Sequence, residues 1–145
     1  MPLPRPELGL VVQYGFVWSG ADRRSPPDAG KDRPCLIADL MEIADTPGRK
    51  TLRVTYLPIS RSAPRQGERA KLVPAPVANH LGLTGEKSYI YTTYACEDDW
   101  PFDLAHVPGH KGRFHYGFIP PKFFDAVAAE FKRYLARSPH VVHRR

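Results

Sequence analysis

The chain has 145 residues, of which 42% are hydrophobic and 25% are charged, and these proportions are typical of an ordinary globular domain. The length suits one domain and is too short for two of comfortable size. Lysine and arginine outnumber aspartate and glutamate by 21 to 15, so the formal net charge is +6. Such an excess permits an anionic partner such as nucleic acid but does not require one.

Cysteine count and hydropathy bear on the cellular compartment. Cys35 and Cys96 are too few for a disulfide framework, and Cys35 lies in an apolar run where a reduced thiol packs as a small hydrophobic group. No stretch approaches the ~20 apolar residues that span a bilayer, and the first residues lack the apolar core of a secretory signal. We therefore expect a cytoplasmic protein with no membrane association.

Both ends of the chain are predicted to lie outside one central domain at 9–137. Residues 1–8 contain three prolines and are expected to form a flexible arm, while the basic tail at 138–145 is expected to fray. Residues 10–18 are β-branched and aromatic almost throughout, which predicts a buried strand. A loop rich in proline, glycine and arginine follows at 19–32, and long loops in compact domains are usually functional or disordered.

The rest of the domain predicts a mainly β fold that ends in a helix. Apolar runs at 34–41 and 51–57 flank turn-forming residues, which predicts an antiparallel pair. Further short elements are expected as a strand near 72–74, a helical turn at 77–81, and strands at 88–94 and 114–118. From Pro120 to Leu135, apolar residues recur at three- and four-residue steps, which is typical of an amphipathic helix. This order favours a small, strongly curved sheet or barrel with the helix packed against it.

The two central strands each carry a polar group of chemical interest at one end. Arg33 lies just before the first of them and Ser60 just after the second. If the strands pair, the guanidinium and the hydroxyl are predicted to meet at one edge of the sheet. Arginine offers a two-pronged cationic donor to a phosphate, and serine offers a hydroxyl donor. An ordinary strand-entry arginine and a serine that serves only the turn remain open alternatives.

Basic residues lie close to this pair in the sequence. We predict that they bind RNA as a group, comprising Arg23, Arg24, Lys31, Arg61, Arg65 and Arg69. Tyr14, Trp18 and Tyr56 are candidates for base stacking, although aromatic residues in strands are mostly core. The acidic run at 97–103 is expected to form a solvated turn, with a role in partner contacts as the alternative.

Histidines supply the remaining candidates. His80, His106, His110 and His115 include possible general bases because histidine titrates near neutral pH, although loop histidines are more often merely solvated. Cys96 with the last three would have a spacing unlike the tightly paired ligands of structural zinc motifs. We therefore predict no metal site and no cofactor.

The order of these elements resembles the PemK/MazF family of toxins from bacterial type II toxin–antitoxin systems, in particular the longer PemK-like variant. The resemblance rests on a glycine-led first strand, Asp-Arg-Pro at 32–34 before an apolar strand, Pro-Ile-Ser at 58–60 after a second, and an Ile-Pro-Pro-led helix at 119–137. It spans most of residues 9–137.

The resemblance implies an SH3-like small barrel that forms a homodimer and is silenced by a small antitoxin protein. It also implies a metal-independent endoribonuclease of single-stranded RNA, in which the Arg-Pro arginine and a threonine or serine after the next strand carry catalysis. Here those positions are Arg33 and Ser60, and the family more often has threonine at the second.

Metal-independent cleavage of RNA requires the ribose 2′-hydroxyl to attack its own phosphodiester, leaving a 2′,3′-cyclic phosphate and a 5′-hydroxyl. We assign Arg33 to stabilising the charged phosphorane, because arginine does not deprotonate in proteins. The alternative function is a non-catalytic interaction module of the same fold, such as a poison of a protein target in the manner of CcdB, or a degenerate toxin relative.

Overall fold

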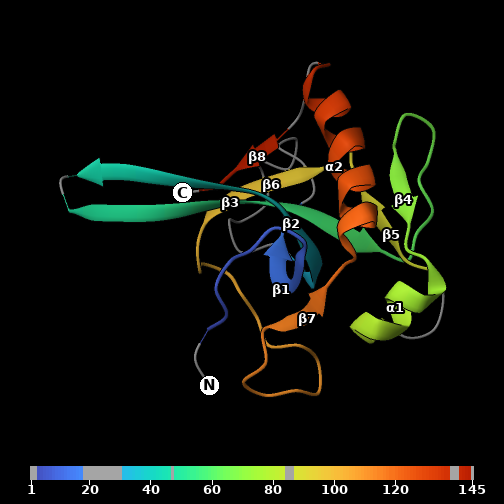
Figure 1. Ribbon diagram of the computed structural model, residues 1–145, viewed down its shortest axis with the longest axis horizontal. Helices are drawn as coiled ribbons and strands as arrows, with labels where there is room; N and C mark the ends of the chain where they lie inside the picture. Colours follow the sequence, from blue (N-terminus) through green and yellow to red (C-terminus); the bar gives the residue numbers. More distant parts are fainter. Residues whose placement is uncertain (1–2, 18–30, 47, 84–86, 138–140, 145) are drawn as a thin grey trace.

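The computed structural model describes residues 3–17, 31–46, 48–83, 87–137 and 141–144 and is mainly β with a C-terminal helix, as predicted (Figure 1). The strands are β1 (Leu10–Phe16), β2 (Lys31–Thr46), β3 (Arg49–Ser60), β4 (Ala70–Leu72), β5 (Tyr89–Tyr91), β6 (Ala95–Asp99), β7 (His115–Phe118) and β8 (Val141–His143). The helices are α1 (Ala75–Leu81) and α2 (Pro121–Leu135). No helix within the described ranges is long and apolar enough to cross a bilayer.

The strands form one curved sheet in the order β4-β5-β3-β2-β1-β7, with every neighbouring pair antiparallel. β6 pairs with β3 off this path, and β8 adds to β6 in parallel. The path begins at β4 and ends at β7, and these two strands are not paired with each other among the described residues. The sheet is therefore open, in contrast to the closed barrel that the family resemblance implies.

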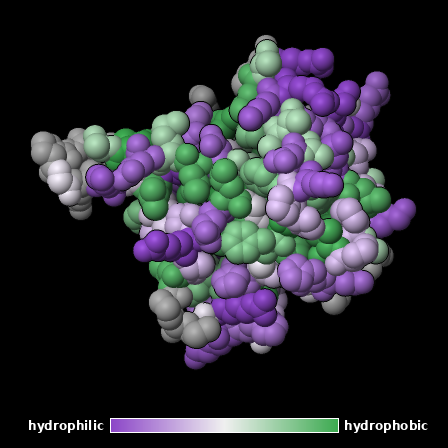
Figure 2. All heavy atoms as spheres, viewed as in Figure 1, coloured by the Kyte–Doolittle hydropathy of each residue, from purple (hydrophilic) through white to green (hydrophobic). Residues whose placement is uncertain are grey.

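The pairing of β2 with β3 is longer than the sequence indicates. The first of these strands is predicted to end near Met41, but the ladder continues to the pair Thr46↔Arg49 at the turn. Figure 1 shows the far ends of β2 and β3 projecting together beyond the rest of the fold as a two-stranded arm. Hydrophobic and hydrophilic side chains are interspersed over its visible face (Figure 2).

Two hydrophobic clusters lie on opposite faces of the central strands, because successive side chains of a strand alternate between faces. One cluster contains Val11, Leu36 and Leu57 together with Val127 and Phe131 of α2. The other contains Val12, Tyr14, Cys35, Ile37, Tyr56 and Cys96. Tyr14 and Tyr56 are therefore core residues and not stacking platforms, while Trp18 lies outside the described residues.

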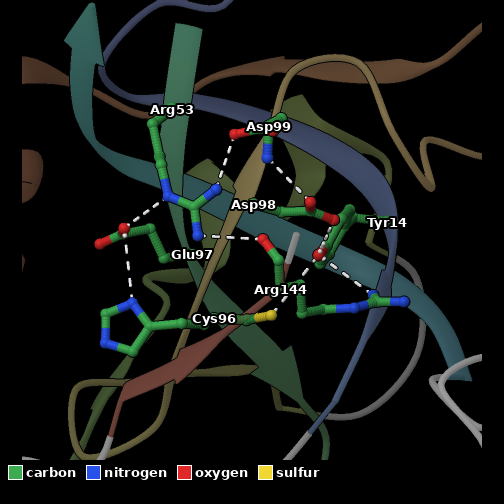
Figure 3. A network of polar contacts seen from close by, with 8 residues as sticks. Tyr14, Arg53, Cys96, Glu97, Asp98, Asp99 and Arg144 are labelled. Carbon is green, nitrogen blue, oxygen red and sulfur yellow. Dashed lines mark hydrogen bonds and ion pairs between the residues drawn. The ribbon is translucent and has the colours of Figure 1, made fainter. Parts of the chain in front are cut away.

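A buried polar network ties the C-terminal end of the chain to β1 (Figure 3). The Tyr14 hydroxyl donates to Asp98 Oδ2 at 2.7 Å and accepts from Arg144 Nη1 at 3.1 Å. Arg144 also donates to the carbonyl of Gly15 and forms an ion pair with Asp103. The contacts of Tyr14 and Gly15 cross more than 80 positions of sequence, so the network fixes β1, β6 and residue 144 in one arrangement.

Arg53 on β3 extends the network. Its Nε and Nη1 atoms lie 2.7 and 2.6 Å from carboxylate oxygens of Glu97 and Asp99, and its Nη2 donates to the carbonyl of Arg144. Two expectations are thereby corrected. The acidic run forms a turn only over 100–103, because 95–99 forms β6 and Asp98 is fully buried. The tail does not fray over 141–144, because β8 pairs with β6 and Arg144 is held by Tyr14.

The stacked rings of Tyr14 and Tyr56, 3.9 Å apart, allow a matched test of this network. Burial raises the pKa of both hydroxyls, so both stay protonated at neutral pH. Tyr14→Phe removes a hydroxyl that hydrogen-bonds with the buried Asp98 and the partly buried Arg144, and it is expected to lower the free energy of unfolding by about 1–3 kcal/mol. The Tyr56 hydroxyl is buried with no hydrogen-bond partner among the described residues. Tyr56→Phe is therefore expected to leave the free energy unchanged or to raise it.

Urea denaturation followed by circular dichroism measures both changes. An equal loss in the two variants would contradict the assignment, since it would show that the Tyr14 hydroxyl contributes no more than an unpartnered one.

Candidate functional site

A pocket with a volume of about 870 Å³ opens where three parts of the chain meet. The adjoining ends of β2 and β3 form one wall, and the C-terminal end of α1 forms a second. The segment 107–113 between β6 and β7 forms a third, with Gln13 of β1 and Tyr116 of β7 beside it. Most of these residues are polar, so the pocket suits a hydrophilic ligand.

Arg33 and Ser60 both line this pocket. The register of the central pair places Cys35 opposite Pro58, and continuing it by two residues brings Arg33 opposite Ser60. Each residue is also held by its other neighbour strand, since Arg33 pairs with Tyr14 and Ser60 with Tyr89. The local pairing of β2 with β3 thus brings the two sequence candidates together, while their catalytic role remains a prediction.

The chemistry of the pair is set by burial and by one hydrogen bond. Burial lowers the pKa of Arg33, but arginine keeps its charge in proteins. Burial raises the pKa of the neighbouring Cys35 thiol, so this cysteine stays protonated and unreactive. Ser60 Oγ accepts a hydrogen bond from the backbone N–H of Ser62 at 3.1 Å. As an acceptor in that bond, the hydroxyl keeps its own proton for donation.

Helix α1 brings His80 and Asn79 to the pocket. Val77 and Leu81 bury one side of the helix, which leaves Asn79 and His80 exposed. The helix ends at Gly82, whose backbone is left-handed (φ 73°), a conformation that glycine adopts without the steric cost of a Cβ. The chain therefore turns at the helix end, and His80 lies next to Gly117 of β7.

The 107–113 segment is a compact loop that holds His110 and Arg113. Hydrogen bonds between backbone groups join Val107 N to Arg113 O, His110 N to Val107 O, and Arg113 N to His110 O. Gly109 and Gly112 both have positive φ, and Gly112 N donates to His106 Nδ1 at 2.6 Å. The two glycines let the loop close tightly, so the positions of His110 and Arg113 are defined.

The charges of the pocket favour an anion. Its lining includes three arginines, Arg33, Arg61 and Arg113, and a single carboxylate, that of Asp32. Two histidines and several neutral donors complete it. Such a set can bind phosphate oxygens and can move protons near neutral pH.

The other predicted RNA-binding residues are not gathered here. Arg61 lines the pocket, but Arg65 and Arg69 do not. Arg23, Arg24 and the side chain of Lys31 lie outside the described residues. Among the candidate histidines, His106 and His115 are also absent from the lining.

Cys96 lies in the core beside Tyr14, with 3.4 Å between its sulfur and the Tyr14 hydroxyl, whereas His110 lines the pocket. Over the described ranges, no three His, Cys, Asp or Glu side chains are close enough together to hold a metal ion.

Several residues of the pocket were not singled out from the sequence, namely Gln13, Asp32, Asn79, Arg113 and Tyr116. The sequence does not distinguish His80 and His110 from the other two candidate histidines, His106 and His115. Only the segment 106–115 indicates part of the pocket in advance, because its glycines alternate with histidines and an arginine, which is typical of a loop with a defined conformation. The position of this segment beside Arg33 depends on pairing between distant strands, which no local sequence pattern indicates.

Comparison with protein-family models, curated proteins and solved structures found no match to this chain. The resemblance to PemK/MazF toxins therefore rests on the sequence features alone and remains a prediction.

The excess of arginine predicts that the pocket binds inorganic pyrophosphate. Arg61→Ala is expected to weaken this binding about tenfold, because a charge-assisted hydrogen bond is lost. Arg133→Ala removes the same charge from an exposed position on α2 and is expected to change the affinity less than about twofold. Calorimetric titration measures both affinities. Equal losses would show that binding follows net charge and not the pocket.

Proposed function

We propose that this chain is a metal-independent endoribonuclease that cleaves single-stranded RNA, and that it acts as the toxin of a type II toxin–antitoxin pair. The observation that carries the proposal is the single pocket in which Arg33 and Ser60 lie with two further arginines and two histidines. These groups match the needs of an internal attack on a phosphodiester, which are charge stabilisation and proton transfer at two oxygens.

Charge stabilisation falls to Arg33 and Ser60. The phosphorane carries more negative charge than the phosphodiester, so donors aimed at its non-bridging oxygens lower the barrier. Arg33 contributes a fixed cation, and the Ser60 hydroxyl contributes a neutral donor held in place by Ser62 N. Arg61 and Arg113 bind the flanking phosphates of the strand.

Proton transfer falls to His80 and His110. One of them takes the proton of the attacking 2′-hydroxyl, and the other protonates the 5′-oxygen as it leaves. Histidine suits both roles because it exchanges a proton near neutral pH. The two residues come from different walls, α1 and the 107–113 loop, so a strand bound between them has a histidine on either side.

The wider assignment follows the resemblance. The toxin would be cytoplasmic, would adopt an SH3-like fold related to its open curved sheet, would act as a homodimer, and would be silenced by a small antitoxin protein. Arg33 and Ser60 occupy the positions that carry catalysis in the PemK/MazF family, and the pocket that they share supports this reading.

The alternative is a non-catalytic interaction module, and the projecting arm favours it. Met41 and Leu52 on this arm are 58% and 38% exposed. Because Met41 pairs with Arg53 and not with Leu52, the two side chains lie on opposite faces of the arm, so each face offers one apolar side chain to a partner. In this reading the arm binds a protein target and the pocket has no catalytic role.

Incubation of the purified protein with long single-stranded RNA in EDTA separates the two readings. We expect cleavage that leaves 2′,3′-cyclic phosphate ends, and Arg33→Ala is expected to slow it by about 10²–10³-fold, because one preorganised donor is lost. Arg133→Ala, on the exposed side of α2, is the matched control and is expected to cleave at the wild-type rate. Absence of cleavage on varied RNAs, or equal cleavage by Arg33→Ala, would exclude the nuclease.

A pH profile tests the proton carriers. Cleavage by the wild type is expected to show a bell-shaped dependence on pH, since one histidine must be neutral and the other protonated. His110→Gln is expected to lose one limb of the bell, whereas His143→Gln, an exposed position on β8, is expected to keep both limbs. An unchanged profile in His110→Gln would assign proton transfer to another group.

A further inference from the structure

Gln13 is a buried amide at the wall of the pocket. The residue is only 5% exposed, yet it lines the pocket from β1. Its backbone is held by the stretch between β6 and β7, because its N–H donates to Phe114 O and its carbonyl accepts from Ala105 N. On the other edge β1 pairs with β2, so the position of Gln13 is defined from both edges of its strand.

The side chain of Gln13 is also held in one orientation. The Tyr116 hydroxyl donates to Gln13 Oε1 at 2.5 Å. Burial raises the pKa of Tyr116 to about 12, so this hydroxyl remains a donor at neutral pH. The amide oxygen thus faces Tyr116, and among the described residues the Gln13 side chain has no other hydrogen bond. The Nε2 group is left to present hydrogens, and only hydrogens, to a ligand.

The surroundings of Gln13 suit a flat, partly apolar group. Pro34 lies opposite Gln13 in the β1–β2 ladder, and both line the pocket. Val107, Pro108 and Tyr116 add apolar surface to the same pocket, whose arginines are better donors for phosphates than a neutral amide is. A nucleobase fits this combination of apolar faces and one polar edge.

We propose that Gln13, oriented by Tyr116, selects a keto nucleobase, guanine or uracil, at one subsite of the pocket; the proposal rests on the proposed function in that it takes the ligand to be RNA. Guanine O6 and uracil O4 accept hydrogen bonds, whereas adenine N6 and cytosine N4 at the corresponding edge are donors. The Nε2 group of Gln13 can donate to guanine and uracil, but it faces another donor in adenine and cytosine. The discrimination between keto and amino bases therefore follows from the orientation of one side chain.

Binding of nucleoside 3′-monophosphates tests the proposal without requiring cleavage. Calorimetric titration is expected to show uridine and guanosine 3′-monophosphates bound about tenfold more tightly than the cytidine and adenosine compounds, the effect of about one hydrogen bond. In Tyr116→Phe the amide is free to turn over, so the preference is expected to fall below about twofold while binding persists. Tyr94→Phe loses a tyrosine–carboxylate bond to Glu68 outside the pocket and is expected to keep the preference.

A second variant tests the same amide by replacing its donor group with an acceptor. Gln13→Glu replaces the donor group by an acceptor and is expected to reverse the preference towards cytidine and adenosine. Gln66→Glu introduces the same charge at an exposed position outside the pocket and is expected to keep the wild-type order. An NMR spectrum of each variant verifies the fold.

The outcomes separate this proposal from the proposed function. A wild-type protein that binds all four nucleotides equally, or prefers the amino bases, overturns the role of Gln13 even if RNA is cleaved. A keto preference that survives in Tyr116→Phe overturns the orienting role of Tyr116. A keto preference that is lost in Tyr116→Phe supports the proposal, and absence of RNA cleavage would then count against the nuclease alone. Absence of nucleotide binding would overturn the role of Gln13, whereas the cleavage assay would still decide the nuclease.

Discussion

The register of β2 against β3 is the constraint on which the rest of the structure depends. A strand alternates its side chains between two faces, so a slip of one residue would exchange the faces of the whole strand. If β2 slipped, Leu36 would leave the cluster that α2 covers, and Cys35 would leave the cluster around Tyr14. The same register brings Arg33 towards Ser60. Core packing and the candidate site are thus consequences of one pairing.

Strand β1 connects the core to the pocket, because adjacent residues of this strand belong to each. Tyr14 is anchored in the second cluster by Asp98 and Arg144, and its neighbour Gln13 therefore points to the opposite face, from which it lines the pocket. The two residues are adjacent in sequence but serve different ends, one fixing the strand and the other lining the pocket. Because Tyr14 is fixed in the core, the direction in which the adjacent Gln13 points is fixed as well.

Features that depend on neighbouring residues could be predicted from the sequence, and features that depend on contacts between distant residues could not. The hairpin with Arg33 and Ser60 at its ends was accessible, because turn residues and apolar runs are local signals. The sequence does not indicate β6, because Glu97, Asp98 and Asp99 are typical of solvent-exposed segments. Their side-chain partners Arg53 and Tyr14 lie far away in sequence. The second and third pocket walls were missed for the same reason. His80 and His110 line the same pocket only once the sheet has formed, and their spacing in the sequence does not indicate this.

Two sets of arginines among the described residues differ in their surroundings. Arg53 and Arg144 each meet carboxylates at 2.6–2.7 Å, the arrangement expected where a guanidinium is retained to hold the fold together. In the pocket, three arginines share the lining with one aspartate, although gathering like charges costs free energy. A bound anion would offset that cost, because a guanidinium forms strong charge-assisted hydrogen bonds with phosphate oxygens. This excess of positive charge is the feature of the pocket that a phosphodiester strand would use.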